Sequence, residues 1–189
     1  IPSISVYLPP QESATGMVVV ICPGGGYGKL DWKTHVVYAA DVFNSQGVAV
    51  IGLKYRTRPP FQGPNEAIQA LTLLDAQRAI RLVRHRARQW NLDPKRIGIA
   101  GYSAGGNLAM NLAANFDAGE PRASDPVERE SCRPDFAIGL ATWHWRQKES
   151  PFRFRADSPP VFLVHATNDG INGVELSKSD GSESGFRPT

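Results

Sequence analysis

The chain has 189 residues, of which 41% are hydrophobic and 21% charged, and its formal net charge is +3 at pH 7. This length predicts one domain with a substantial core, and the composition excludes a disordered chain, a collagen and a coiled coil. The longest apolar runs, such as residues 17–22, fall far short of the ~18 residues that a membrane-spanning helix needs. The small positive charge is only a weak indication of nucleic-acid binding.

The two cysteines and the start of the chain say little about the cellular compartment. Cys22 and Cys132 are too few for a disulfide framework, so they form either one bridge or two free thiols. No signal peptide is present, but the sequence opens at Ile1 rather than at Met. We therefore expect a processed or trimmed start, which leaves the compartment open.

Short apolar runs along the chain predict the strands of a sheet. Runs that are apolar throughout and rich in β-branched residues are typical of strands covered on both faces, as in a parallel sheet. Five such runs occur, at residues 17–22, 48–51, 97–100, 136–140 and 161–164. Residues 3–8 alternate more between apolar and polar side chains, which predicts an edge strand that ends at Pro9.

Helices are predicted between these runs, over residues 31–45, from about 64 to 91, and over 104–116. The segment 117–134 is polar and contains prolines, so we expect a loop there. Alternating strands and helices predict an α/β fold with right-handed crossovers and a ligand site at the carboxyl ends of the strands.

A basic stripe lies along the long predicted helix, opposite its apolar face. The stripe consists of Arg78, Arg81, His85 and Arg88. Because no aromatic residues that could stack on bases are interleaved with it, we expect a solvent-exposed helix face rather than a nucleic-acid site.

The residues that follow the run 97–100 match the nucleophile motif G-x-S-x-G. Gly101-Tyr-Ser-Ala-Gly-Gly106 stands between a predicted strand and a predicted helix, which is the context that this motif requires. The glycines keep side chains out of a sharp turn, and Ser103 would stand at the positive end of the following helix. The N–H group of Ala104 would point toward a developing oxyanion. The alternative is a small-residue turn without a chemical role.

A glycine-rich loop follows the run 17–22. Three glycines, Gly24, Gly25 and Gly26, allow backbone amides to turn into a pocket without interference from Cβ atoms. A phosphate-binding loop is excluded because Gly28-Lys29-Leu30 lacks the hydroxyl residue and the spacing, and a dinucleotide motif fails at Lys29. The loop therefore favours an oxyanion hole for acyl transfer, with a plain turn as the alternative.

Together the two motifs carry a resemblance to a known family. Cys-Pro-Gly-Gly-Gly-Tyr followed by Gly-Tyr-Ser-Ala-Gly-Gly resembles α/β-hydrolase fold esterases, in particular hormone-sensitive-lipase-like acetyl esterases and acetylxylan esterases. Residues 53–56, 75–81 and 159–166 are similar to the same group. The resemblance implies a core over residues 1–170, with a mostly parallel sheet that has helices on both faces and is truncated at both ends. The remaining residues 171–189 would be an atypical or disordered polar tail.

The same resemblance implies the chemistry of the site. Ser103 would be the nucleophile of a serine esterase, and the amides of Gly25, Gly26 and Ala104 would bind the oxyanion, with no metal and no organic cofactor. Asp169, on the loop after the run 161–164, would be the acid of a Ser-Asp-His triad. The substrate would be a short acyl ester or an acetylated saccharide, without a nucleic-acid or membrane partner, and a secreted or periplasmic location is favoured.

The triad histidine is missing from its expected place in the sequence. It should follow Asp169, but the four histidines are His35, His85, His144 and His165. We interpret His165 as structural, and His144 either approaches Ser103 or helps Trp143 and Trp145 to line a pocket. The chain alone is therefore predicted to be a weak or inactive esterase.

Two further functions stay open. A serine peptidase of the same fold would need a larger N-terminal domain than 189 residues allow. A non-catalytic binding module on a hydrolase scaffold would keep the same core without an activated Ser103.

Overall fold

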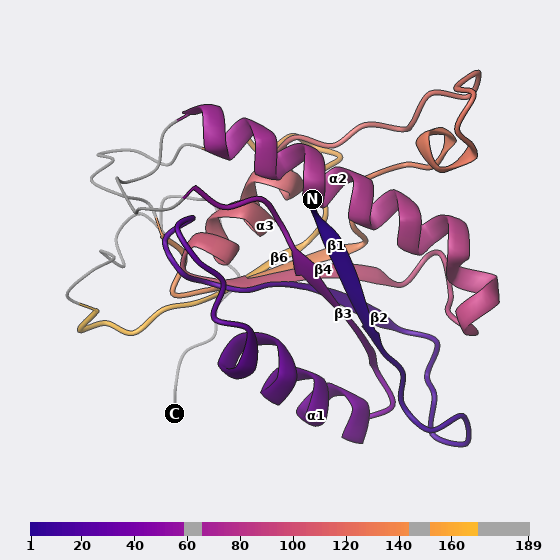
Figure 1. Ribbon diagram of the computed structural model, residues 1–189, viewed down its shortest axis with the longest axis horizontal. Coiled ribbons are helices and arrows are strands. Elements are labelled where there is room, and N and C mark those ends of the chain that lie inside the picture. Colours follow the sequence, from indigo (N-terminus) through magenta and orange to yellow (C-terminus); the bar gives the residue numbers. More distant parts are fainter. Residues whose placement is uncertain (59–65, 144–151, 170–189) are drawn as a thin grey trace.

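The computed structural model describes residues 1–58, 66–143 and 152–169. They form a six-stranded sheet with the order β1-β3-β2-β4-β5-β6, in which β1 is antiparallel to β3 and all other neighbours are parallel (Figure 1). The strands are β1 (Ser3–Tyr7), β2 (Val18–Cys22), β3 (Ala49–Lys54), β4 (Ile97–Tyr102), β5 (Phe136–Leu140) and β6 (Val161–Val164). All six predicted strands are confirmed, including the edge strand near the N-terminus.

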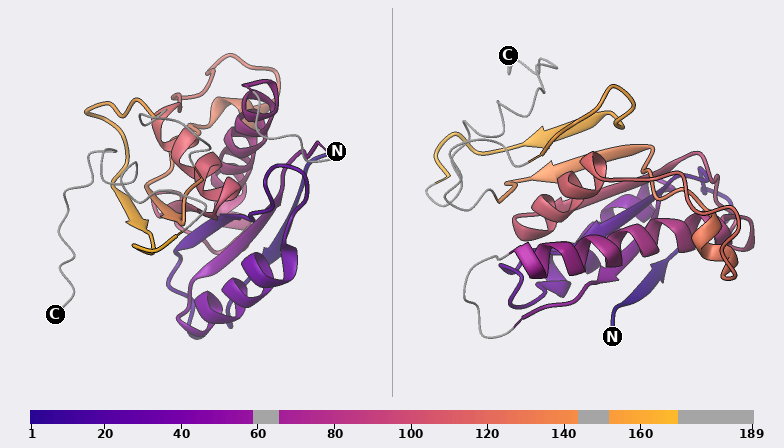
Figure 2. Two further views of the ribbon diagram at one scale, coloured as in Figure 1. Left: turned by 90° about the vertical axis from the view of Figure 1, so that its left-hand side faces the viewer. Right: turned by 90° about the horizontal axis from the view of Figure 1, so that it is seen from above.

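Helices cover both faces of this sheet, which confirms the predicted α/β-hydrolase architecture. The long helix α2 (Glu66–Arg86) and helix α3 (Ala104–Ala114) pack on one face, and α1 (Tyr38–Ser45) lies on the other (Figure 2). The described residues also form three shorter helices: the π-helix η1 (Lys33–Val37) and the 3₁₀-helices η2 (Ala87–Trp90) and η3 (Pro126–Arg129). No described helix is both long and apolar enough to cross a membrane.

The core lies on both sides of the central strands. All five residues of β2 are buried, as expected for a strand with neighbours on both edges and helices on both faces. Both cysteines are buried free thiols, which decides between the two alternatives left open by the sequence. Burial raises the pKa of the Cys22 thiol well above its ordinary value and also raises the pKa of the Cys132 thiol, which disfavours the thiolate form of both.

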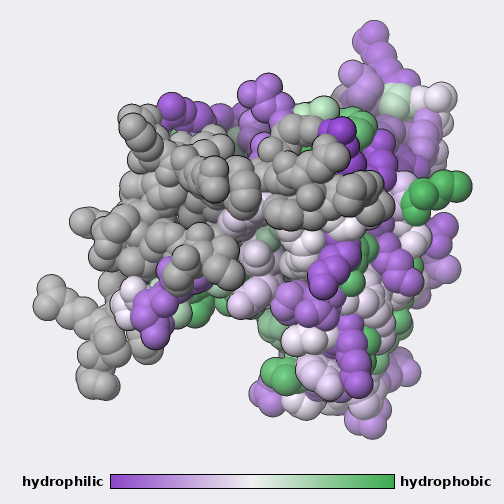
Figure 3. All heavy atoms as spheres, turned by 60° about the vertical axis from the view of Figure 1, so that its left-hand side comes forward, coloured by the Kyte–Doolittle hydropathy of each residue, from purple (hydrophilic) through white to green (hydrophobic). Residues whose placement is uncertain are grey.

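The outer strand is less well covered. Phe162 and Val164 of β6 are 53% and 46% exposed, and no described helix covers their side of β6 (Figure 2). On the face shown in Figure 3, hydrophobic residues otherwise occur as small separate patches among hydrophilic ones.

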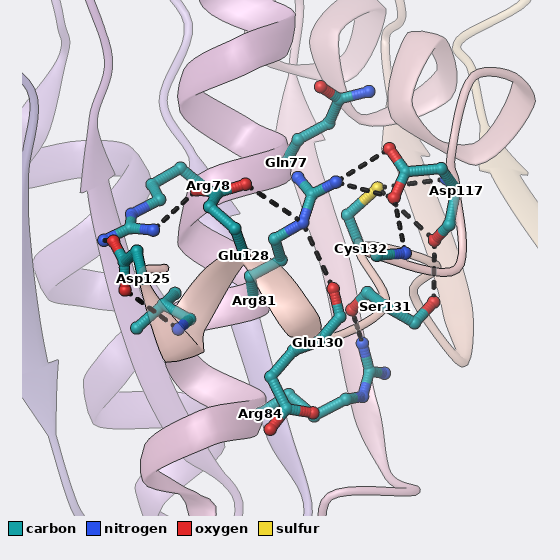
Figure 4. Close-up of polar contacts among 12 residues, drawn as sticks. Gln77, Arg78, Arg81, Arg84, Asp117, Asp125, Glu128, Glu130, Ser131 and Cys132 are labelled. Atoms are coloured by element: carbon teal, nitrogen blue, oxygen red, sulfur yellow. Dashed lines mark hydrogen bonds and ion pairs between the residues drawn. The ribbon is translucent and has the colours of Figure 1, made fainter. Parts of the chain in front are cut away.

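The prediction that the basic stripe on α2 is exposed to solvent is wrong for Arg81. Its side chain is only 10% exposed, and its guanidinium donates to both carboxylate oxygens of Asp117, at 2.6 and 2.7 Å, and to the carbonyl of Glu130 at 3.1 Å. Arg78 pairs with Asp125 and Glu128 in the same way (Figure 4). These arginines therefore attach the predicted loop 117–134 to α2, a contact that helical periodicity alone does not reveal.

Replacing Arg81 with methionine should lower the free energy of unfolding by about 1–3 kcal/mol, because the part-buried bonds to the Glu130 carbonyl and the Asp117 carboxylate lose their donor. Arg88→Met is the matched control, since Arg88 follows the predicted stripe but is exposed. Urea unfolding of both variants measures the difference, and equal stabilities would contradict a fastening role for Arg81.

Candidate active site

Ser103 occupies a sharp turn between β4 and α3, as the motif predicts. Its backbone has φ 53° and ψ −116°, a strained conformation for a residue with a side chain. Tight backbone contacts hold the turn: a Cβ atom on Gly101 would lie 2.1 Å from the carbonyl oxygen of Gly105, and one on Gly105 would lie 1.9 Å from that of Cys22. The turn therefore depends on glycine at both positions.

The glycine-rich loop after β2 lies directly against this turn. A Cβ atom on Gly24 would approach the Ser103 Cβ to 3.3 Å and the Tyr102 carbonyl oxygen to 2.8 Å. Gly25 and Gly26 have φ of 137° and 65°, values that glycine adopts without strain. The loop and the turn thus form one site at the carboxyl ends of neighbouring parallel strands.

Three backbone amides in this site have no hydrogen-bond partner among the residues that the structure describes. Among the described residues, no hydrogen bond uses the N–H of Gly25, Gly26 or Ala104. Unpaired donors beside a serine at the N-terminus of a helix are what an oxyanion hole requires. The arrangement brings together the three residues whose amides were predicted to bind an oxyanion.

Buried polar side chains fix the far side of the loop. The Tyr27 hydroxyl donates to Asn107 Oδ1 at 2.7 Å, and Asn107 Nδ2 donates to the Trp143 carbonyl at 2.9 Å. The Tyr55 hydroxyl donates to the carbonyl of Pro23. Sequence reasoning did not identify these supports, although a buried Asn one helical turn after the candidate nucleophile is a usable signal.

His35 of η1 is a further neighbour that the sequence did not predict. Its Nδ1 accepts a hydrogen bond from the Gly24 N–H at 3.0 Å, and its ring stacks on that of Tyr102 with centroids 4.5 Å apart. Burial lowers the pKa of His35, although the nearby Asp31 carboxylate works in the opposite direction.

Asp169 follows β6, as predicted, and it contacts a histidine. Its Oδ2 lies 3.3 Å from His165 Nε2, and the two side chains are 16% and 4% exposed. His165 was interpreted as structural and precedes the acid instead of following it. No hydrogen bond joins Ser103 Oγ to either side chain in the described part of the chain.

The serine and the acid follow different strands of the sheet. Ser103 follows β4 and Asp169 lies beyond the end of β6, and these strands are two positions apart, roughly 10 Å at the usual strand spacing. His144 and Trp145 lie outside the described residues, whereas Trp143 is buried and packs on Tyr27, with ring centroids 6.1 Å apart. Within the described ranges, no group of three His, Cys, Asp or Glu side chains could hold a metal ion.

Comparison with known proteins agrees with the fold described above. The structure is similar to an acetyl ester-xyloside bifunctional hydrolase from Caldicellulosiruptor lactoaceticus, with a TM-score of 0.80 and 30% identity over 94% of this chain and 71% of that one. Esterase 2 of Thermogutta terrifontis, at 20% identity and a TM-score of 0.69, shares the α/β-hydrolase fold. A family model described as BD-FAE matches residues 4–131, and the chain belongs to this family.

Curated relatives carry esterase and xylanase names. An acetylxylan esterase of Xylanibacter ruminicola is 36% identical over 128 residues, which are 67% of this chain and 22% of that protein. Endo-1,4-beta-xylanase B of Butyrivibrio fibrisolvens is 31% identical over 139 residues, covering 73% of this chain and 21% of that protein. The chain thus spans about a fifth of the length of these two relatives.

Proposed function

We propose that the chain is the core of a serine carboxylic-ester hydrolase that acts on short acyl esters. The observation that carries this proposal is Ser103, held at φ 53° at the N-terminus of α3, beside the Gly25 and Gly26 amides, which donate to no described residue. Relatives named acetylxylan esterase and ethyl acetate hydrolase support ester cleavage, and the first of these names favours an acetylated carbohydrate as the substrate.

In the proposed reaction, Ser103 Oγ attacks the acyl carbonyl carbon and forms a C–O bond. The carbonyl oxygen becomes an oxyanion, which accepts hydrogen bonds from the amides of Gly25, Gly26 and Ala104. The bond to the alcohol then breaks, and the alcohol leaves with the proton that Ser103 gave up. Water hydrolyses the resulting acyl-serine, which returns the proton to Ser103 and releases the carboxylic acid.

The proton transfers in this scheme need a base that Asp169 would orient. In a serine triad a histidine takes the serine proton, and the acid holds the imidazole in the correct tautomer. No described histidine is bonded to Ser103 Oγ. We therefore infer that the chain alone retains the nucleophile and the oxyanion hole but is weakly active.

The lack of a described hydrogen-bond partner for Ser103 Oγ also favours a second candidate, a binding module that keeps the hydrolase scaffold without catalysis. The two candidates differ in the reactivity of Ser103. An oxyanion hole stabilises the transition state of phosphonylation even without a histidine, whereas a binding site gives no such stabilisation.

A fluorophosphonate probe should label Ser103 about 10³-fold faster in the folded chain than in the urea-unfolded chain, which reflects the residual catalysis of an oxyanion hole. Peptide mapping by mass spectrometry locates the adduct. Ser103→Ala should remove it, and Ser45→Ala, at an exposed position on α1, should retain it. Equal labelling of folded and unfolded chains would favour the binding module.

A further inference from the structure

His35 connects the two halves of the candidate site. His35 lies in η1, a π-helical turn, and π-helical turns are frequent at functional sites. Its Nδ1 accepts from the Gly24 N–H, and its ring stacks on Tyr102, the residue directly before Ser103. A Cβ atom built on Gly24 would lie 3.2 Å from His35 Cε1 and 3.3 Å from Ser103 Cβ. The imidazole therefore contacts both the oxyanion loop and the nucleophile turn.

Three hydrogen bonds link Gly24, Asp31 and His35 to one another. Gly24 donates to His35 Nδ1 at 3.0 Å and accepts from the Asp31 N–H at 2.9 Å, and the His35 N–H donates to the Asp31 carbonyl at 3.2 Å. Both backbone polar groups of Gly24 are thus fixed immediately before Gly25, whose own amide donates to none of the described residues. Without the imidazole acceptor, the N–H of Gly24 would lose its only partner among the described residues.

We propose that His35 is a positioning residue that holds the oxyanion loop in place by accepting the Gly24 amide. This role rests on the proposed esterase function, because the loop it positions is the candidate oxyanion hole. A displacement of about 1 Å in a catalytic group can cost about 100-fold in rate, so a single lost anchor has a large kinetic effect.

The contact requires one protonation state of the imidazole. Nδ1 accepts a hydrogen bond only when it carries no proton, so the neutral ring has its proton on Nε2. Charged and titratable groups around the ring are the Asp31 carboxylate from the preceding turn, the Tyr102 phenol from β4 and the Tyr38 phenol from α1. The two tyrosines and His35 line one apolar cavity of about 400 Å³. The anchor is present above the pKa of His35 and is lost as the pH falls through it.

Two substitutions separate an acceptor role from a packing role. In His35→Asn the side-chain oxygen replaces Nδ1 as the acceptor, whereas His35→Leu keeps apolar volume but has no acceptor. His85→Leu is the matched control, because His85 lies on the remote helix α2 next to Glu130. Fluorophosphonate labelling of Ser103 should slow about 100-fold in His35→Leu, by less than about fivefold in His35→Asn, and not at all in His85→Leu.

The Gly24 amide gives a readout that does not depend on activity. In the wild-type chain its hydrogen exchange should be slow and its NMR resonance should titrate with His35, with protection lost at low pH. His35→Leu should exchange at least tenfold faster and His35→Asn should stay protected. If wild-type Ser103 is not labelled, the proposed function fails, and this exchange alone decides the role of His35. A fast-exchanging, pH-independent Gly24 amide in the wild type would overturn the proposal, as would equal behaviour of the Asn and Leu variants.

Discussion

The 189-residue chain should hydrolyse p-nitrophenyl acetate about 10⁶-fold more slowly than a complete serine triad allows, because that is the cost of losing the triad histidine alone. In the described residues Ser103 Oγ has no histidine partner, and Asp169 contacts His165. The remaining rate, about 10³–10⁴ above the uncatalysed reaction, would come from the oxyanion hole and from binding. Initial rates of p-nitrophenol release, with the Ser103→Ala variant as the blank, measure this remaining rate.

Imidazole hydrolyses this ester slowly by itself, so its rate without protein is subtracted first. Above that blank, added imidazole should raise the rate of the wild-type chain and not that of Ser103→Ala, since a free base can take the serine proton when no side chain does. His144→Ala and His165→Ala serve as controls for an internal base. Robust turnover without imidazole that is lost in Ser103→Ala but kept in both histidine variants would contradict the expected deficit and would indicate a base from another chain.

Replacing Gly105 with alanine should destabilise the fold by about 3 kcal/mol or more, because its Cβ would meet the Cys22 carbonyl oxygen at 1.9 Å and the Pro23 carbonyl oxygen at 2.7 Å. The backbone of β2, a buried central strand, cannot move away from this Cβ atom without breaking the contact between the oxyanion loop and α3. The gain in helix propensity, about 1 kcal/mol for alanine over glycine, is too small to offset this clash.

Gly106→Ala is the matched control at the next position of the same helix. Its Cβ would meet atoms only at 3.0–3.2 Å, and the nearest of them is the Thr142 side chain. We expect its free energy of unfolding to stay within about 1 kcal/mol of the wild type, since this crowding and the gain in helix propensity oppose each other. Urea unfolding distinguishes the two variants, and equal losses of unfolding free energy would contradict a specific clash at Gly105.

Local sequence patterns were sufficient for the elements that depend on local physics. Continuous apolar runs predicted β5 and β6 with the observed bounds, although the burial on both faces that such runs indicate does not hold for β6, where Phe162 and Val164 are exposed. The turn at Ser103 and the loop at Gly25 were also predictable, since only glycine-rich segments permit such close backbone approach.

Contacts between distant segments were not predictable in this way. The burial of Arg81 depends on the segment 117–134 folding over α2, and a helical stripe alone indicates solvent exposure. Likewise, no local pattern shows that His35 reaches Gly24, or that Tyr27 bonds to Asn107 across 80 positions. The pairing of His165 with Asp169 joins residues only four positions apart, but it depends on how the chain turns after β6.

The most direct test of the account is whether an acyl group forms on Ser103. Acid quenching of the chain with p-nitrophenyl acetate, followed by peptide mapping, detects an acetyl-serine that accumulates because deacylation also lacks its base. We expect the acetyl group on the peptide that contains Ser103, and none in Ser103→Ala. A chain that releases p-nitrophenol without acetylated Ser103, or that is equally acetylated in Ser103→Ala, would contradict the assignment of Ser103 as the nucleophile.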